Sequence, residues 1–220
     1  MPAVGEHHPA FEEYCECIFE LQEDELSVAQ VRIAERLQVS RAAVSEMIKR
    51  LLAEGLITQD GRDIHLTAQG LDIAQRTVRR HRLAERFLTD VLGLSWAEAH
   101  HEAGRWEHVM SDAVESAMTR VLGHPTTCPH GNPIPGAAYD EPTQVPLAGI
   151  AVGTTFTVSR IPEELEFTPG LLDFLEERSI LPGRAGRLVA ATADGALHID
   201  IDGATVEVDR FVGERMLVVL

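Results

Sequence analysis

The order of short segments between residues 11 and 66 restricts the fold more than any other feature of this chain. Apolar spacing and turn signals predict five elements here, namely helices over 11–25, 28–37 and 40–53 and strands over 56–59 and 64–66. Ser27 and Ser40 stand where helix caps are expected, and Asp60-Gly61 is a strong hairpin signal. Three helices followed by a hairpin, with a tight turn between the second and third helices, predict a winged helix-turn-helix.

Behind this region the chain changes from helical to β-rich patterns. The patterns predict long helices over 68–92 and 95–122, a short helix over 171–177, and strands over 153–161, 187–193, 197–201 and 205–208. Six prolines between Pro125 and Pro146 predict an irregular linker. We expect a mainly α protein with a β tail, divided into a winged helix-turn-helix at 1–72, a helical domain at 73–136, a proline-rich linker at 137–147 and a small β-barrel at 148–220.

Charge distribution, cysteine content and the lack of long apolar runs indicate in which cell compartment the protein is expected. The net charge is −16, yet residues 27–86 hold 11 Lys/Arg against 7 Asp/Glu, so the acidic excess lies elsewhere. Three cysteines are too few for a disulfide framework. No apolar run is long enough for a membrane span, and residues 1–8 lack the regions of a signal peptide. We expect a cytoplasmic protein without membrane contact.

The third predicted helix carries residues suited to reading DNA. In a helix-turn-helix, the second helix of the motif enters the major groove, and residues near its start touch base edges. The expected base contacts are Ser40, Arg41, Ala42, Ser45 and Glu46, and the expected phosphate or wing contacts are Arg32, Lys49, Arg50 and Arg62. Double-stranded DNA is therefore the predicted partner, and protein docking by the winged helix is the alternative.

A second group of residues has metal-ligand chemistry. His81 and Glu85 lie one turn apart on the helix behind the hairpin. Alone, this pair is typical of a core histidine and its hydrogen-bond partner. The next helix adds His100, Glu107 and His108 along one flank, which packing does not explain.

Two further features fit the same interpretation. Gly104 lies on that flank and leaves room beside it, and the first helix presents Glu13 and Glu16 on its polar face. Without the partner helices, those two acids would be an ordinary solvated surface. With them, imidazole and carboxylate groups from three helices predict a site for a divalent metal ion.

The sequence resembles the diphtheria-toxin-repressor family of iron- and manganese-dependent regulators. The resemblance rests on the segments 79–86 (RRHRLAER), 102–112 (EAGRWEHVMSD), 33–37 (IAERL) and 130–136 (HGNPIPG). It is strong over 11–136 and weak over the β-rich tail. It implies a homodimer, with one or two dimers on each operator, a helical metal-binding and dimerisation domain, and an SH3-like (FeoA-like) C-terminal domain.

The resemblance also implies two metal sites in each subunit. The ancillary site would use His81, Glu85 and His100, and the primary site would use Glu107, His108 and a residue of the first helix. In many family members the C-terminal domain supplies further ligands to the ancillary site. The tail of this chain departs from the family pattern at those positions, and Glu164 or Glu166 would be the substitute ligand. Cys128 and His130 are interpreted as loop residues of a family motif rather than as ligands.

The ligand set departs from that of the iron-responsive members in an informative way. Where they carry a methionine and a cysteine, this chain has Glu13 and Gly104, and only the backbone carbonyl of Gly104 can bind a metal. Glu13 together with Glu16 resembles the first-helix acids of the manganese-responsive branch. Exchanging soft sulfur for carboxylate favours harder ions, so Mn(II) is the first expectation and Fe(II) the second.

These features predict a metal-dependent repressor that controls metal-uptake genes, and not an enzyme. A metal-dependent hydrolase is the first alternative, but His81 and Glu85 do not form the HExxH arrangement. A regulator that senses an organic ligand or oxidation through Cys15 and Cys17 is the second. Residues at i and i+2 of a helix point apart, which weakens that hypothesis.

Overall fold

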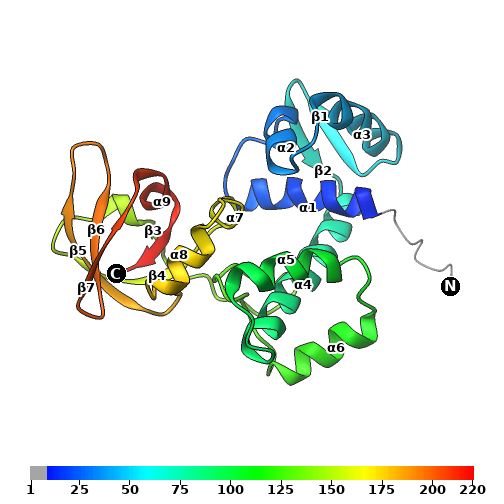
Figure 1. Ribbon diagram of the computed structural model, residues 1–220. Coiled ribbons are helices and arrows are strands. Elements are labelled where there is room, and N and C mark those ends of the chain that lie inside the picture. The colour runs from blue at the N-terminus through cyan, green and yellow to red at the C-terminus, as the bar shows by residue number, and fades with distance from the viewer. Residues whose placement is uncertain (1–8) are drawn as a thin grey trace.

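Helices α1 (Pro9–Glu23), α2 (Gln30–Arg36) and α3 (Arg41–Ala53) build the N-terminal part of the computed structural model, which describes residues 9–220 (Figure 1). The hairpin of β1 (Ile57–Asp60) and β2 (Asp63–Leu66) completes this part. Their apolar faces share one core, which includes Ile18, Ile33, Val44, Ile48, Leu51 and Ile64. The predicted winged helix-turn-helix is confirmed, while the signal-peptide argument rests on residues 1–8, which lie outside the described residues.

The two predicted caps had different outcomes. Ser40 caps α3, since its Oγ accepts a hydrogen bond of 3.1 Å from the amide three residues ahead. The prediction for Ser27 was wrong, because α2 begins at Gln30 behind Ala29, which offers no side-chain cap. Val28 is buried, and its carbonyl accepts a 3.1 Å hydrogen bond from the amide of Ile64 in the hairpin. This link to the hairpin delays the start of the helix.

Three helices form the middle part: α4 (Ala68–Asp90), α5 (Trp96–Trp106) and α6 (Asp112–Val121). Ser95 caps α5 as predicted, but the single helix expected over 95–122 was wrong. The chain turns behind Trp106 and starts again behind Ser111, whose side chain accepts from the amide of Val114 at 3.4 Å. A serine followed by Asp112 and Glu115 is a helix-start signal, and here it overrides the continuous apolar spacing.

The proline-rich stretch has no helix or strand before β3 (Val145–Pro146), as expected, but its first half is packed into the protein. Cys128, His130 and Asn132 are fully buried. Gly131 has a φ of +89°, and a Cβ atom there would lie 2.3 Å from a carbonyl oxygen of β4. This close approach fixes the position of His130.

The C-terminal part is an antiparallel sheet with strand order β3-β8-β4-β5-β6-β7. Its remaining elements are η1 (Leu147–Gly149), β4 (Thr155–Arg160), α7 (Glu163–Glu166), α8 (Leu171–Glu177), β5 (Ala185–Ala191), β6 (Leu197–Ile201), β7 (Ala204–Val208), α9 (Arg210–Arg215) and β8 (Leu217–Val219). The four predicted strands and the helix at 171–177 are present. The sequence patterns did not reveal α7, α9, β3 and β8, which are too short to show a period.

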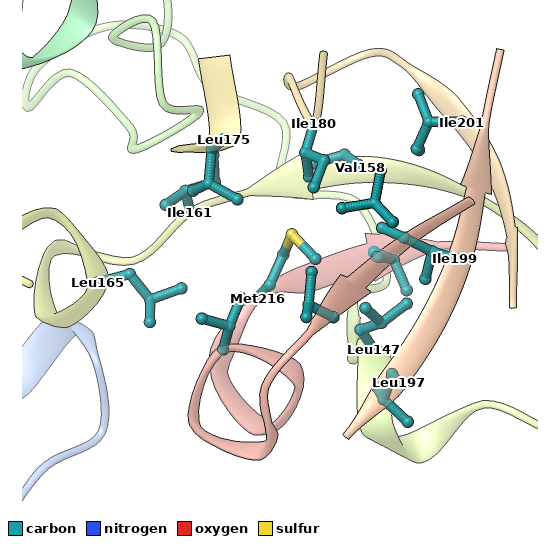
Figure 2. Packing of buried hydrophobic residues seen from close by; sticks show 14 of the residues in the cluster. Leu147, Val158, Ile161, Leu165, Leu175, Ile180, Leu197, Ile199, Ile201 and Met216 are labelled. Atoms are coloured by element: carbon teal, nitrogen blue, oxygen red, sulfur yellow. The ribbon is translucent and has the colours of Figure 1, made fainter. Parts of the chain in front are cut away.

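The sheet curves around one apolar core (Figure 2). Figure 2 shows Val158, Ile199 and Leu147 pointing into this core together with Met216. Leu165 of α7 is part of the same core, so this short helix is anchored in the C-terminal sheet domain. Within the described residues, no helix combines the length and the apolar character that crossing a membrane requires.

Candidate metal centre

A cavity of about 300 Å³ opens between α1, α4 and α5. Its lining includes Glu13, Glu16, Glu20, His81, His100, Gly104 and Glu107, and it also includes Arg36 of α2 and Phe167 behind α7. Helix α1 contributes its acids at helical spacing, so that Glu16 and Glu20 share one face. Both are buried, which is unusual for carboxylates and requires partner groups.

We name one group of residues the outer cluster: Glu13, Glu16 and Glu107, which line the cavity, and His108, which lies beside Glu107. Three potential ligand atoms lie within 4.8 Å of one another here, one each from Glu16, Glu107 and His81. His108 Nε2 lies 3.2 Å from Glu107 Oε1 and 3.7 Å from Glu13 Oε2. Glu13 is exposed and stands at the rim, whereas Glu107 is buried. The outer cluster therefore joins α1 to α5 and the turn behind it.

His108 has the orientation of a metal-binding imidazole. Its Nδ1 donates a hydrogen bond of 2.8 Å to Glu12, which leaves Nε2 toward Glu107 and Glu13. Nε2 is buried and has no hydrogen-bond partner. A carboxylate that holds one imidazole nitrogen so that the other faces a metal is the usual arrangement around such sites. Sequence reasoning missed Glu12, because neighbouring helix residues point in different directions and Glu13 was chosen.

Deeper in the protein lies what we name the inner cluster: His81, Glu85, His100, Cys128, His130 and Glu166. Glu85 is at its centre, and its Oε1 lies 3.2 Å from His81 Nε2 and 3.0 Å from His100 Nδ1. His81, Glu85 and His100 place ligand atoms within 4.8 Å of one another, and so do Glu85, Cys128 and His130. The structure thus brings the three predicted ancillary residues together.

Two elements distant in sequence complete the inner cluster. His130 Nδ1 lies 2.8 Å from Oε2 of Glu166, which in turn is 3.2 Å from His100 Nδ1. Asn132 holds the other Glu166 oxygen with a hydrogen bond of 2.6 Å. Of the two acids considered as substitutes, Glu166 lies in the cluster, whereas Glu164 contacts Arg215 and Arg32. The interpretation of Cys128 and His130 as loop residues alone did not anticipate this placement.

The buried donor atoms fit a divalent ion. Glu85 Oε2, Glu166 Oε2, Glu16 Oε1 and both nitrogens of His130 are buried without a hydrogen-bond partner. His130 Nδ1 and Glu166 Oε2 are close, yet they lack hydrogen-bond geometry. Two ligands bound at about 2.1 Å and about 90° to one another lie about 3.0 Å apart, so such contacts are those of atoms that point at one common ion.

The electrostatics of the two clusters are dominated by mutual contacts. The carboxylates of Glu12 and then Glu13, which face its two ring nitrogens, raise the pKa of His108 to about 10. Burial opposes protonation of His100, but Glu166 and Glu85 outweigh it and raise its pKa to about 10. Burial, with Glu107 and Glu20 nearby, raises the pKa of Glu16 above its ordinary value. Protons therefore occupy these ligand atoms when nothing else does, and an ion must displace them.

His81 faces both clusters. Its Nδ1 lies 2.5 Å from Glu107 Oε2, and its Nε2 lies 3.2 Å from Glu85 and 3.3 Å from His100. Burial opposes its protonation, but Glu85 and Glu107 raise its pKa well above the ordinary value. A neutral imidazole has one lone pair, so His81 can bind an ion through one nitrogen while the other donates a hydrogen bond.

Most of the residues predicted to contact DNA are exposed. Ser40, Arg41, Ala42, Glu46, Lys49, Arg50 and Arg62 are exposed, and Ser45 is half-buried. Glu46 pairs with Lys49 at 3.4 Å, and Arg50 covers the ring of Phe11. Arg32 differs from them, because its guanidinium lies 3.6 Å from Glu164 of the C-terminal sheet domain.

Comparison with known proteins identifies the family. The chain matches the model of the iron dependent repressor N-terminal DNA binding domain over residues 8–63, and that of the iron dependent repressor metal binding and dimerisation domain over residues 67–136. These two matches cover more than half of the sequence. The chain belongs to the iron-dependent repressor family. The diphtheria-toxin-repressor resemblance seen in the sequence is thereby confirmed.

Full-length relatives agree with this assignment. The iron-dependent repressor IdeR of Mycobacterium tuberculosis is 38% identical over 204 residues, which are 87% of this chain and 88% of the relative. The diphtheria toxin repressor of Corynebacterium diphtheriae is 44% identical over 126 residues, which are 57% of this chain and 56% of the relative. These relatives are transcriptional repressors and not enzymes, as the sequence analysis expected.

Solved structures extend the likeness to the C-terminal sheet domain. A manganese-dependent transcriptional repressor in complex with manganese has a TM-score of 0.85 and 33% identity, with 95% of this chain and 99% of that chain covered. The manganese regulator SloR has a TM-score of 0.75 and 31% identity over 94% and 97% of the chains. The fold is that of a metal-dependent transcriptional repressor of the iron-dependent repressor family, with an SH3-like C-terminal sheet.

Proposed function

We propose that this protein is a Mn(II)-activated repressor that binds palindromic operator DNA as a homodimer and controls genes for metal uptake. The observation that carries the choice of metal is the donor set of the outer cluster. It contains carboxylates and one imidazole, and Gly104 offers only a backbone carbonyl to the same cavity. Hard oxygen donors favour manganese over softer ions, although later transition metals bind most sites of this kind more tightly.

The ligands are assigned to two ions in each subunit. Glu13, Glu16, Glu107 and His108, with the Gly104 carbonyl, hold the outer ion. His81, Glu85 and His100 hold the inner ion, and Glu166 completes that set from the C-terminal sheet domain. We assign Nε2 of His81 to the inner cluster, so that its Nδ1 donates to Glu107 at 2.5 Å and orients a carboxylate of the outer cluster.

The mechanism follows from where the outer cluster lies. An ion held by the outer cluster would link α1 to the turn behind α5, in place of the protons that the same ligand atoms carry without it. Glu16 and Glu13 come from the helix that supports the winged helix-turn-helix, and Glu107 and His108 follow the helices of the dimerisation domain. Closing this joint holds two recognition helices about 34–36 Å apart, or a multiple of that distance, as a palindrome requires.

The exposed apolar residues of the middle part support a dimer. Val109 is 80% exposed, Val121 is 66% exposed and Val114 is 46% exposed, and all lie on or beside α6. Exposed valines grouped in this way are typical of a surface covered by another protein. This region falls within the residues that match a dimerisation domain.

Ser40, Arg41, Ala42, Ser45 and Glu46 are proposed to contact base edges, and Lys49, Arg50 and Arg62 are proposed to contact the backbone. The exposed start of α3 supports the first assignment. Arg32 is proposed to reach a phosphate only when it leaves Glu164, because that carboxylate lies beside its guanidinium.

Fe(II) is the second candidate, and two observations favour it. The curated relatives named above are iron-dependent repressors or diphtheria toxin repressors. Cys128, moreover, places a sulfur in the inner cluster. Burial, with Glu85 and Glu166 nearby, raises the pKa of this thiol well above its ordinary value, so only an ion able to displace the proton would use it.

The test measures affinity for DNA against free metal. DNA duplexes are first selected by the Mn²⁺-loaded protein from a random-sequence pool, and binding is then titrated with Mn²⁺, with Zn²⁺ and, anaerobically, with Fe²⁺. We expect the protein to bind the selected duplex tightly at the free Mn²⁺ concentrations that occur in a cell. Metal-free protein that binds the duplex as tightly as loaded protein would contradict the proposal. A response to Fe²⁺ alone would show that the repressor is activated by Fe(II) and not by Mn(II).

A further inference from the structure

Helix α7 of the C-terminal sheet domain meets all three parts of the protein within five residues. It lies beside the C-terminal end of α1 and below α2, at the junction of the three parts (Figure 1). Leu165 anchors it in the sheet core, and Glu163 accepts hydrogen bonds of 2.9 and 3.2 Å from the buried Arg82 of α4. Its position is therefore fixed from two sides.

The next contacts of α7 reach the winged helix-turn-helix. The amide of Glu164 donates to Asp24, just behind α1, at 3.0 Å. The carboxylate of Glu164 lies 3.6 Å from Arg32 of α2 and 2.5 Å from Arg215 of α9. One turn of α2 further on, Arg36 lies over the ring of Phe167, with its Cζ 4.5 Å from the ring centroid.

Phe167 also touches the inner cluster. Its ring centroid lies 5.4 Å from that of His100, edge to face, and Glu166 beside it lies 3.2 Å from the same imidazole. Phe167 therefore stands between an imidazole of the inner cluster and the last residue of α2. Arg36 itself is nearly buried and donates to Glu20 at 3.2 Å, so it cannot turn away from the ring without losing that partner.

Helix α2 transmits this contact to the recognition helix. Ile33 and Ala34 of α2 share the winged-helix core with Val44 and Ile48 of α3. A packed core moves as a unit, because its side chains interlock without voids. A constraint on Arg32 and Arg36, which lie on one face of α2 at i and i+4, is thus a constraint on α3.

We propose that Phe167, assisted by Glu164, positions α2 and the recognition helix relative to the inner cluster, so that the C-terminal sheet domain couples that cluster to DNA binding. The inference rests on the proposed function, since it specifies how one of its two ions communicates with DNA. Phe167 and Glu164 are positioning residues that bind neither ion nor DNA. By linkage, the C-terminal sheet domain also lets DNA strengthen the inner cluster's hold on its ion.

The test compares Phe167→Ala with Phe211→Ala in the full-length protein. Phe211 is the matched control, because it is 36% exposed against 42% for Phe167 and also lies against an arginine, Arg215 of α9, at 3.9 Å. Arg215 pairs with Glu164, so this control keeps the ring on Arg36 and tests only the support of Glu164. The quantity measured is the ratio of affinities for a selected DNA duplex with and without Mn²⁺. We expect Phe167→Ala to lower this ratio about fivefold, and Phe211→Ala to change it less than about twofold.

Two further variants and a second readout separate positioning from general support. Phe167→Tyr keeps the ring on Arg36 and should keep the ratio within about twofold of the wild-type value. Glu164→Gln removes the charge that pairs with Arg32 and Arg215 at a half-buried position, and it should lower the ratio about twofold. Mn²⁺ affinity without DNA should stay within about twofold in Phe167→Ala. Hydrogen exchange of the α2 amides should slow on adding Mn²⁺ in the wild type and in Phe211→Ala, but not in Phe167→Ala.

The outcomes distinguish this inference from the function on which it rests. A wild-type protein without any Mn²⁺ response would overturn the proposed function and this inference with it. A normal response of Phe167→Ala would overturn the positioning role alone. So would an equal loss in Phe167→Ala and Phe211→Ala, or a loss of DNA-free Mn²⁺ affinity as large as the loss of the ratio, since either would show a merely structural role.

Discussion

The outer and inner clusters use the same residue types in opposite structural settings. The outer cluster spans a joint between α1 and α5, and its Glu13 side chain is 54% exposed. The inner cluster is closed, with the side chains of Glu85 and His130 at 0% exposure, and it collects residues from α4, α5, the proline-rich stretch and α7. A cluster across a joint can open and close and so switch the structure, whereas a closed cluster fixes the relative positions of the elements that contribute to it.

Arginine contacts strengthen this contrast. Around the inner cluster, Arg82 is fully buried and binds Glu23, Glu163 and the carbonyl of Pro133. Arg160 binds Glu23 and Asp24 at 2.9 and 3.0 Å. The inner region is therefore held by ion pairs whether or not an ion is bound. Beside the outer cluster, Arg76 lies 3.8 Å from Glu12 and Arg36 lies 3.2 Å from Glu20, so each of these arginines pairs with an acid of α1.

The largest effect is expected at Glu107, which faces both clusters through His81 and His108. Glu107→Ala removes the carboxylate that lies 2.5 Å from His81 and 3.2 Å from His108. We expect Mn²⁺-stimulated DNA binding to fall more than about 100-fold, because a coupling between two sites is typically of about this size and this residue carries it. Fluorescence anisotropy of the selected duplex measures the response.

Glu102→Ala is the control for this prediction, because Glu102 lies on α5 five residues before Glu107 and pairs with Arg105 at the surface. It should respond to Mn²⁺ as the wild type does. A full response of Glu107→Ala would contradict the assignment of the outer cluster.

Glu12 tests whether the outer cluster is organised beyond its ligands. Glu12→Gln keeps the size of the side chain but exchanges the carboxylate that accepts from His108 Nδ1 at 2.8 Å. We expect Mn²⁺ affinity of the outer cluster to fall about 10-fold or more, with Mn²⁺ affinity of the inner cluster unchanged. Equilibrium dialysis separates the two ions, and a loss at both clusters would show that they are not independent.

His81, Glu85 and His100 of the inner cluster could be predicted from the sequence because their positions follow from helical periodicity. His81 and Glu85 are one helical turn apart, and His100 lies on the neighbouring helix, so periodicity alone brings them near one another. Residues His130 and Glu166 obey no such rule, since each depends on how an irregular segment or a four-residue helix packs. The only local signal was the presence of Cys128 and His130 two residues apart.

The helix break at residues 107–111 shows a similar limit. Apolar spacing continued through it, and the capping signal of Ser111 and Asp112 was the weaker pattern in the sequence. The break matters for the site, because the turn behind Trp106 carries both Glu107 and His108. The contacts of these two side chains with α4 and α1 act together with the Ser111 cap, and single-sequence periodicity does not contain them.

The pH dependence sharpens the comparison, because the inner cluster holds more imidazoles. Glu166 and Glu85 raise the pKa of His100 to about 10 against burial, and Glu12 with Glu13 raise that of His108 to about 10. In metal-free protein, this contribution to stability is complete below the ordinary pKa of 6.5 and is lost as pH rises through 10. An ion competes for the same lone pairs, so Mn²⁺ affinity rises across that window.

The rise should reach at most about tenfold per pH unit for each proton displaced. Calorimetry in two buffers of different ionisation enthalpy counts the protons released near pH 7.5. In Glu107→Ala, in which the outer cluster is disabled, we expect most of the release to remain, because His100, His81 and His130 belong to the inner cluster. A release that disappears with Glu107 would assign the titrating imidazoles to the outer cluster instead.

Among the variants of proposed ligands, the smallest effect on DNA binding is expected from Glu166, which the C-terminal sheet domain contributes to the inner cluster. Glu166→Gln removes a charge 2.8 Å from His130 and 3.2 Å from His100, but leaves the arginine contacts of Arg82 and Arg160 in place. We expect the Mn²⁺ response of DNA binding to fall only about fivefold, and the thermal stabilisation by Mn²⁺ to fall clearly. Glu207→Gln, at an exposed cross-strand pair with His198, is the control. If Glu166→Gln abolished the response as completely as Glu107→Ala, the inner cluster would itself be a switch, and the division of labour between a joint and an anchor would be wrong.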